Sequence, residues 1–277
     1  MHLFHFVSQQ CSKITTEKYS TSFSSAIKLL HESLRTPIYN IYGLVRFADE
    51  IVDTFHEHDK QQLLQDFKAD TFRAIANRIS LNPILHSFQI TVNKYNIDLH
   101  LVEAFFDSME QDLNKTQYDE GGYNQYIYGS AEVVGLMCLY VFCEGDKTMF
   151  AKLQPSAQAL GAAFQKVNFL RDLKADYQDL NRTYFPGVDF RNFTTSMKQQ
   201  IEAEITNDFE KAYSGIIQLP VKARFGVYVA YKYYLSLFRK IKRSQPSLLL
   251  DNRIRIPNYS KALIVMRAGV RSQFNIL

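Results

Sequence analysis

The sequence predicts an all-α protein, and three observations lead to this fold class. Apolar residues recur at helical spacing in most segments, as Leu64, Phe67 and Ile75 do within residues 59–79. Period-two alternation is rare, and no hairpin signal interrupts the helical pattern. No linker divides the 277 residues, and a chain of this length can bury about 75% of its unfolded surface. We therefore expect residues 1–277 to form one helical domain.

Capping residues and prolines indicate where the helices begin. Thr36-Pro37 and Asn82-Pro83 each combine a capping residue with a proline at the first helical position, and Asp98 is a further candidate cap. The expected helices span residues 16–34, 36–53, 59–79, 83–94, 98–114, 123–143, 155–176, 195–219 and 220–244, with an irregular loop at 177–193 and a last helix after Pro257.

Small residues interrupt the most apolar of these helices, residues 123–143. Gly129, Ser130, Ala131 and Gly135 would allow another helix to approach closely. Glycine within a helix is less stable than alanine by about 1 kcal/mol, so we expect a packing or ligand-binding reason for these positions. The apolar run at 133–143 is shorter than the ~20 residues that a membrane-spanning helix requires.

The composition excludes several functions. A net charge of +4 gives no reason to expect nucleic-acid binding. Cys11, Cys138 and Cys143 have neither a disulfide pattern nor a metal-ligand spacing, which is typical of a reducing compartment. The sequence lacks Glu-x-x-His pairs, clustered histidines and glycine-rich nucleotide motifs, which argues against di-iron, zinc and nucleotide sites. With no signal peptide evident, we expect a cytoplasmic protein, and its oligomeric state is open.

Two distant segments each carry aspartates at i, i+4 spacing. In residues 42–53, Asp49 and Asp53 share a helical face with Tyr42 and Arg46. The second segment, residues 165–186, places five polar residues within about a quarter of the helix circumference: Gln165, Asn168, Asp172, Asp176 and Asp179.

The repetition of this pattern favours a metal site over a solvated acidic surface. Like charges ~4 Å apart repel by roughly 4 kcal/mol at an effective dielectric constant of 20, so a cation is expected between buried carboxylates. Mg²⁺ prefers oxygen ligands and is usually held by one or two carboxylates together with substrate phosphates. Two facing helices of this kind could hold several Mg²⁺ ions and two diphosphates.

Four motifs in this order resemble the head-to-head prenyl synthases, the squalene and phytoene synthases. They read YSTSF at 19–23, YxxxRxxDExxD at 42–53, YxYGSAEVVG at 126–135, and QxxNxxRDxxxD followed by RxYFP at 165–186. The resemblance covers nearly the whole chain and is closest to bacterial phytoene synthases. It implies an all-α isoprenoid synthase bundle with a central active-site cavity.

The resemblance also implies roles for individual residues. Asp49, Asp53, Asp172 and Asp176 would hold Mg²⁺, with Mn²⁺ as an alternative ion, and Asn168 would assist them. Glu50 stands where many relatives have aspartate, and its role is open. The remaining residues would bind diphosphate or lie near the reacting carbons. The diphosphate would be bound by Ser20, Ser22, Arg46, Gln165, Arg171 and Arg182, and the tyrosines near the reacting carbons would be Tyr42, Tyr128 and Tyr184.

Some of these assignments have simpler interpretations. Ser20 and Ser22 could merely cap a helix, and Arg171 lies about 60–100° away from the aspartate face at ideal helical geometry. Near the C-terminus, Arg253, Arg255 and Tyr259 resemble the closing segment of the family only loosely.

The implied reaction joins two prenyl diphosphates head to head through a cyclopropylcarbinyl diphosphate. We expect two geranylgeranyl diphosphates to give phytoene, as in carotenoid biosynthesis. Squalene or dehydrosqualene synthesis from two farnesyl diphosphates is the alternative, and only squalene formation would need NADPH. A non-catalytic isoprenoid-binding protein on the same scaffold is a further alternative, although four clustered carboxylates argue against it.

A basic helix at residues 220–244 raises the question of membrane contact. Its Lys232, Arg239, Lys240, Lys242 and Arg243 accompany a run of apolar side chains. A solvated basic face is the simpler interpretation. Peripheral contact with the inner face of the membrane is the alternative, because anionic lipid attracts basic patches.

Overall fold

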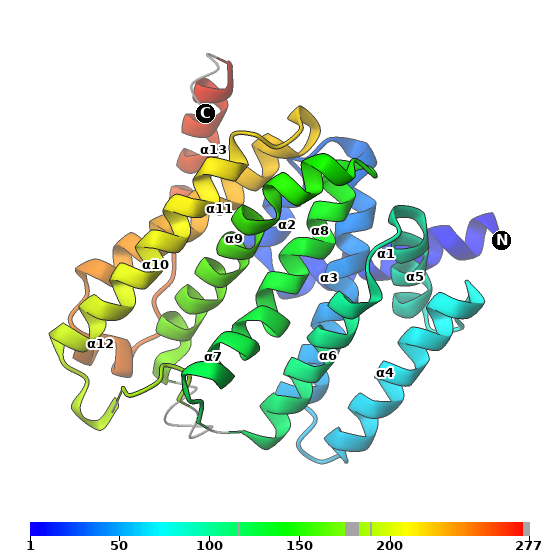
Figure 1. Cartoon of the computed structure of the whole chain (residues 1–277). Coiled ribbons are helices and arrows are strands. Elements are labelled where there is room, and N and C mark those ends of the chain that lie inside the picture. The colour runs from blue at the N-terminus through cyan, green and yellow to red at the C-terminus, as the bar shows by residue number, and fades with distance from the viewer. Residues whose placement is uncertain (116, 175–182, 189, 274–277) are drawn as a thin grey trace.

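The computed structural model describes residues 1–115, 117–174, 183–188 and 190–273, and this part of the chain is all-α (Figure 1). Its β-structure consists of one isolated bridge between Gln117 and Thr183. A π-helical turn, η1 (Tyr128–Glu132), joins α7 and α8, and a 3-10 turn, η3 (Phe190–Asn192), precedes α10. The helices are α1 (His2–Tyr19), α2 (Thr21–Ile27), α3 (Glu32–Asp53), α4 (Lys60–Asn77), α5 (Pro83–Tyr95), α6 (Leu99–Asn114), α7 (Glu120–Ile127), α8 (Val133–Cys143), α9 (Lys147–Lys174), α10 (Thr195–Ile216), α11 (Val221–Arg243), α12 (Pro246–Asp251) and α13 (Asn258–Gln273).

Side-chain caps begin several helices where the sequence places them. Asp59 accepts a hydrogen bond from the backbone N–H of Gln62 at the start of α4, and Asp98 caps α6 in the same way through His100. Asn82 accepts from the first turn of α5, directly before Pro83. A capped first turn has fewer unsatisfied N–H groups, which stabilises a helix by typically ~1 kcal/mol. The predicted starts of α4, α5 and α6 are therefore confirmed.

Three predicted boundaries are wrong. Residues 16–34, expected as one helix, form the end of α1, the whole of α2 and the start of α3, because the chain leaves the helical conformation at Ser20 (φ −139°, ψ 102°) and at His31 (φ −57°, ψ 144°). Pro37 and Pro155 lie inside α3 and α9 instead of opening them. In both cases the turns before the proline carry a buried leucine, Leu34 or Leu153, so core packing extends each helix toward its N-terminus.

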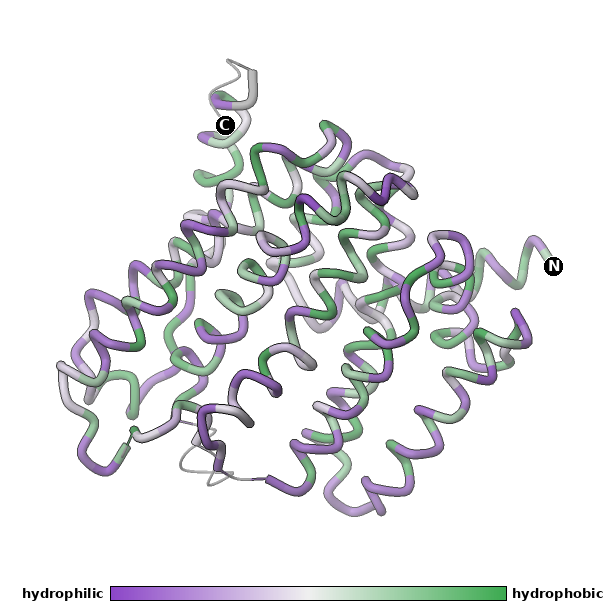
Figure 2. Tube along the Cα trace, in the orientation of Figure 1, coloured by the Kyte–Doolittle hydropathy of each residue, from purple (hydrophilic) through white to green (hydrophobic). Residues whose placement is uncertain are grey.

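Two apolar clusters form the core. One gathers residues of α3, α5, α6 and α8, including the fully buried Leu44, Phe88 and Phe105. The other lies around α9, α10 and α11, with Val167 and Phe209 among its members. Burying one such side chain stabilises the fold by about 1.5–3 kcal/mol relative to leaving it exposed. In Figure 2, purple and green alternate along α4 and α10, as expected for helices with one face on the core.

The segment Glu120–Cys143 forms one continuous helical rod through α7, η1 and α8. By length and composition it could cross a membrane, but 56% of its most apolar window is buried inside the protein. Its small residues have a packing role, as predicted. A Cβ at Gly129 would lie 2.5 Å from the carbonyl oxygen of Ala104, and one at Gly161 of α9 would lie 2.7 Å from that of Ala131. Glycine at both positions therefore lets α6 and α9 contact η1 directly.

Candidate active site

A cavity of about 520 Å³ lies between the two apolar clusters, in agreement with the predicted central cavity. Its size falls within the range of about 300–1,000 Å³ that is usual for ligand sites. Side chains of α2, α3, α8, α9, α10 and α11 line it. α3 and α9 both contribute their last turns, and these turns carry the acidic residues.

The two acidic motifs meet in this cavity although more than one hundred residues separate them. Asp49 and Asp53 of α3 line it together with Gln165, Asn168 and Asp172 of α9. Asp176 and Arg182 lie outside the described residues. Within the described part of the chain, no cluster of three acidic, histidine or cysteine side chains is close enough to hold a metal ion by itself.

Asp49 of α3 lies beside a second carboxylate, that of Asp53. Burial and the negative charge of Asp53 raise the pKa of the Asp49 carboxyl to about 7. Arg46 opposes this shift only in part, since its Nη1 lies 3.6 Å from Asp49. A pair of carboxylates that resists full ionisation is stabilised by a divalent cation, and its oxygen donors suit Mg²⁺. The donor set of α3 therefore fits the expected metal.

Arg46 is held mainly by Glu50 and Tyr19. Its Nη2 donates to Glu50 Oε2 at 2.7 Å, and its guanidinium carbon lies 4.4 Å from the centre of the Tyr19 ring. Glu50 also accepts a hydrogen bond from Thr54 Oγ1. Burial alone would raise the pKa of Glu50, but the hydrogen bonds from Thr54 and Arg46 lower it. The Glu50 carboxylate is thus directed toward Arg46. Glu50 does not line the cavity, whereas Asp49 and Asp53 of the same helix do.

Asp172 is bound by two arginines. Arg171 donates from Nε and Nη2 to its two carboxylate oxygens, at 3.0 and 2.5 Å. Arg253, from the segment between α12 and α13, approaches the same oxygens at 2.7 and 3.5 Å. Arg171 lies off the aspartate face of the helix, but its side chain is long enough to reach Asp172. Both arginines also line the cavity.

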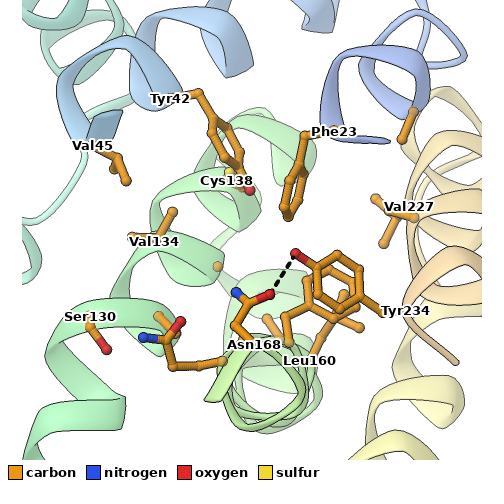
Figure 3. A pocket seen from close by; sticks show the side chains of 18 of the residues that line it. Phe23, Tyr42, Val45, Ser130, Val134, Cys138, Leu160, Asn168, Val227 and Tyr234 are labelled. Atoms are coloured by element: carbon orange, nitrogen blue, oxygen red, sulfur yellow. Dashed lines mark hydrogen bonds between the residues drawn. The ribbon is translucent and has the colours of Figure 1, made fainter. Parts of the chain in front are cut away.

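Asn168 is positioned from the opposite helix. The hydroxyl of Tyr234 on α11 donates to Asn168 Oδ1 at 3.3 Å. Figure 3 shows these two residues approaching the cavity from one side, with Tyr42 and Phe23 on the other. Burial raises the pKa of Tyr42 well above its usual value, so its hydroxyl stays protonated.

Aromatic rings cover much of the cavity wall. Tyr184 stacks on Phe169 with ring centres 4.0 Å apart and planes inclined by 9°. Phe164 stacks on Tyr234 at 3.9 Å, and Phe23 contacts Tyr42 at 4.7 Å. Aromatic faces stabilise a nearby cation through their quadrupoles. This wall is compatible with chemistry that passes through positive charge.

Three predicted site residues do not line the cavity. Ser20 caps α2 by accepting from Phe23 N at 3.2 Å, which agrees with the simpler interpretation given above. The carbonyl of Ser22 accepts from Ser25, one turn later. Tyr128 lies on η1 with 37% of its surface exposed, while Tyr126 two residues earlier contributes to the wall.

The remaining wall is apolar and extends away from the acidic residues. Leu153 at the start of α9, Phe142 at the end of α8 and Leu219 after α10 form its distant part. Because α9 contributes residues from Leu153 to Asp172, the cavity follows this helix for most of its length. The site thus combines a charged end with a long apolar interior.

The sequence did not identify Tyr234 as a site residue and identified Arg253 only by a loose likeness. Tyr234 stands in a tyrosine-rich stretch whose pattern indicates core packing, and nothing local marks its contact with Asn168. Arg253 lies 81 residues from Asp172 in the chain. Only the tertiary fold brings these side chains to the site.

Known proteins match this chain in sequence and in fold. A model of the squalene/phytoene synthase family matches residues 16–260. The chain is 26% identical over 202 residues to the 4,4'-diapophytoene synthase of Staphylococcus haemolyticus, covering 72% of this chain and 69% of that protein. It is 22% identical over 288 residues to the phytoene synthase of Arthrospira platensis, covering 95% and 92%. By contrast, it spans 61% of chloroplastic phytoene synthase 1 of Zea mays, with 25% identity.

A solved structure shows the same fold. The crystal structure of a dehydrosqualene synthase in complex with ligand superposes with a TM-score of 0.83, at 19% identity, over 97% of this chain and 98% of that one. The likeness confirms the predicted isoprenoid synthase bundle. The chain therefore belongs to the squalene/phytoene synthase family, whose members are prenyltransferases that join two prenyl diphosphates head to head.

Proposed function

We propose that this protein condenses two geranylgeranyl diphosphates to phytoene, through a cyclopropylcarbinyl diphosphate and with Mg²⁺ as its metal ion. The observation that carries the proposal is the meeting of the α3 and α9 carboxylates at the charged end of a long apolar cavity. A protein that only stored an apolar chain would gain nothing from desolvating these carboxylates.

The metal would be held by side chains from both helices. Asp49 and Asp53 of α3 and Asn168 and Asp172 of α9 offer the oxygen donors that Mg²⁺ prefers. Asp176, which the motif adds as a further ligand, lies outside the described residues. When bound, Mg²⁺ neutralises the charge that develops on a departing diphosphate.

The protein's own cations would complete the diphosphate site. Arg46, Arg171 and Arg253 line the cavity and are bound to carboxylates in this structure. A guanidinium group pairs equally well with phosphate oxygens, often in a bidentate manner. Once metal ions compensate the carboxylates, these arginines would be able to turn to the diphosphates.

The apolar part of the cavity would bind the prenyl chains and exclude water. Leu153 and Asp172 are nineteen residues apart on α9, which corresponds to about 28 Å along the helix axis. At roughly 1.2 Å per bond of an extended chain, the sixteen-carbon main chain of a geranylgeranyl group spans about 18 Å. The lining is thus long enough for the C20 substrate. Tyr42, Phe23 and Tyr184 would shield the carbocation from water and stabilise it through their rings.

Farnesyl diphosphate is the second candidate substrate. The observation that favours it is the similarity to the diapophytoene synthase of Staphylococcus haemolyticus, at 26% identity. A farnesyl main chain spans about 13 Å by the same estimate, so the length of the lining admits both substrates. Chain length is therefore the property to measure first.

The test is a product analysis with purified protein, Mg²⁺ and each diphosphate separately, with and without NADPH. We expect phytoene from geranylgeranyl diphosphate, no requirement for NADPH, and loss of turnover with EDTA. A hydrocarbon formed only from farnesyl diphosphate would replace the C20 assignment by the C15 one. If neither substrate were converted, the enzymatic proposal would be wrong.

A further inference from the structure

The last helix, α13, carries an apolar stripe that faces solvent. At 100° per residue its four members fall within an arc of about 60°. Between 44% and 70% of each of these side chains is exposed. The opposite face packs on α11, and the buried Ala268 belongs to it. The stripe consists of Tyr259, Leu263, Met266 and Val270.

The charge around this stripe has one sign. Residues 252–273 contain no Asp or Glu, whereas Arg255, Lys261, Arg267 and Arg271 are all basic. A fifth basic residue, Arg253, is paired with Asp172 in the cavity. From residue 211 to the C-terminus, Asp251 is the only acidic residue beside thirteen Lys and Arg. The rest of the chain must therefore be acidic overall, since the net charge of the whole chain is +4. Positive charge is concentrated in the part of the protein that includes α13.

We propose that α13 docks on the surface of an anionic lipid bilayer. A helix with one apolar face and basic flanks lies in the interface, with its apolar side chains among the lipids and its cations near the headgroups. Anionic headgroups complement the uniform charge of residues 252–273, whereas a neutral surface does not. The exposed Arg267, one residue after Met266, is placed to contact such headgroups.

The docking face differs from the one that the sequence suggests. The apolar residues of α11 accompany a basic run, but Tyr231, Tyr234 and Phe238 are buried in the core. They cannot enter a membrane without unfolding the protein. Two cations are held at the α11–α13 contact, since Lys232 lies 5.6 Å from the ring centre of Tyr228, and Arg271 donates to the hydroxyl of that same tyrosine.

The arrangement places lipid near the apolar part of the cavity. Gly226, Val227 and Ala230 of α11 line the cavity, while Tyr228 of the same helix contacts Arg271 of α13. One helix, about 10 Å across, therefore separates the cavity from α13. A bilayer bound to α13 would lie close to the wall that encloses the apolar ligand.

The absence of tryptophan makes the test direct. The chain contains no Trp, so the M266W variant carries a single tryptophan at the centre of the stripe. We expect its emission to shift to shorter wavelength on vesicles of phosphatidylglycerol but not on vesicles of phosphatidylcholine. Because the binding depends on charge, 0.5 M NaCl should weaken it at least about tenfold. Equal shifts on both vesicle types would overturn the proposal.

A double substitution and a matched control test the stripe itself. We expect L263S/M266S to reduce co-sedimentation with phosphatidylglycerol vesicles at least about tenfold, with an unchanged circular dichroism spectrum. The control L3S/F6S removes two exposed apolar side chains of α1 and should leave co-sedimentation unchanged. An equal loss in the control would contradict docking through α13. So would a concentration-dependent emission shift of M266W without lipid, since it would mean that a second copy covers the stripe.

Discussion

The two acidic helices share one sequence pattern but differ in their electrostatic state. On α3, Arg46 is engaged by Glu50, so Asp49 and Asp53 repel each other and the pKa of Asp49 rises to about 7. On α9, Arg171 and Arg253 together bind Asp172. Arg46 thus compensates Asp49 only in part, at 3.6 Å, whereas Asp172 on α9 is paired closely with two arginines. A metal ion would relieve repulsion on α3 but would compete with two arginines on α9.

The largest expected effect is loss of activity when either half loses a carboxylate. Asp49→Asn and Asp172→Asn should each reduce kcat/KM by at least about 10²-fold, because in the proposed mechanism each removes negative charge that would hold the metal against the diphosphate. Steady-state kinetics with saturating Mg²⁺ would measure this. Asp107→Asn is the control, since Asp107 lies on the surface and pairs with Lys68. Full activity in either cavity variant would contradict the role of that half.

A smaller effect is expected from the arginine that reaches α9 from the C-terminal segment. Arg253→Ala should lower kcat/KM about tenfold by removing the proposed charged contact to diphosphate, corresponding to about 1.4 kcal/mol. Arg255→Ala is the matched control, because Arg255 is exposed two residues away and does not line the cavity. Equal effects of the two substitutions would show that general charge, and not the position of Arg253, matters.

The smallest expected effect distinguishes the two halves by the sign of a stability change. Without metal, Asp49→Asn should raise Tm by about 2–4 °C, because it removes a carboxylate that repels Asp53. Asp172→Asn should lower Tm by about 3–6 °C, because two guanidinium groups lose their partner. Thermal denaturation in EDTA measures both. Tm shifts of the same sign would contradict the contrast between carboxylate repulsion on α3 and arginine pairing on α9.

Much of the fold could be predicted because periodicity and caps are local signals. Asp59, Asn82 and Asp98 begin their helices as expected. The first helix was missed for a physical reason: the buried residues of α1 are Ser8, Ser12 and Thr16, which give no apolar period. Ser12 packs against Gly43 of α3, where a Cβ would lie 2.6 Å from its hydroxyl oxygen. Small polar residues thus replace the apolar face that usually reveals a helix.

The site was predictable only where its residues follow a helical repeat. Aspartates at i, i+4 spacing predict Asp49, Asp53 and Asp172 as cavity residues from spacing alone, while Asp176 lies outside the described residues. Tyr234 and Arg253 reach Asn168 and Asp172 from segments 66 and 81 residues further along the chain. No spacing rule connects such positions. Sequence alone therefore identifies the carboxylates of the cavity better than the cations and hydroxyls that contact them.

The face of α9 that packs on α10 carries buried ion pairs that affect the orientation of the cavity residues. Lys166, adjacent to Gln165, is buried and pairs with Glu204 and with Asp208, the latter at 2.7 Å, and both partners belong to α10. This anchor fixes the rotation of α9 about its own axis, and with it the direction of Asn168 and Asp172. Dipoles that are already oriented need little reorganisation energy when a bond ionises. The ion pairs of Lys166 with α10 would therefore lower the activation barrier for ionisation, although none of these side chains contacts the substrate.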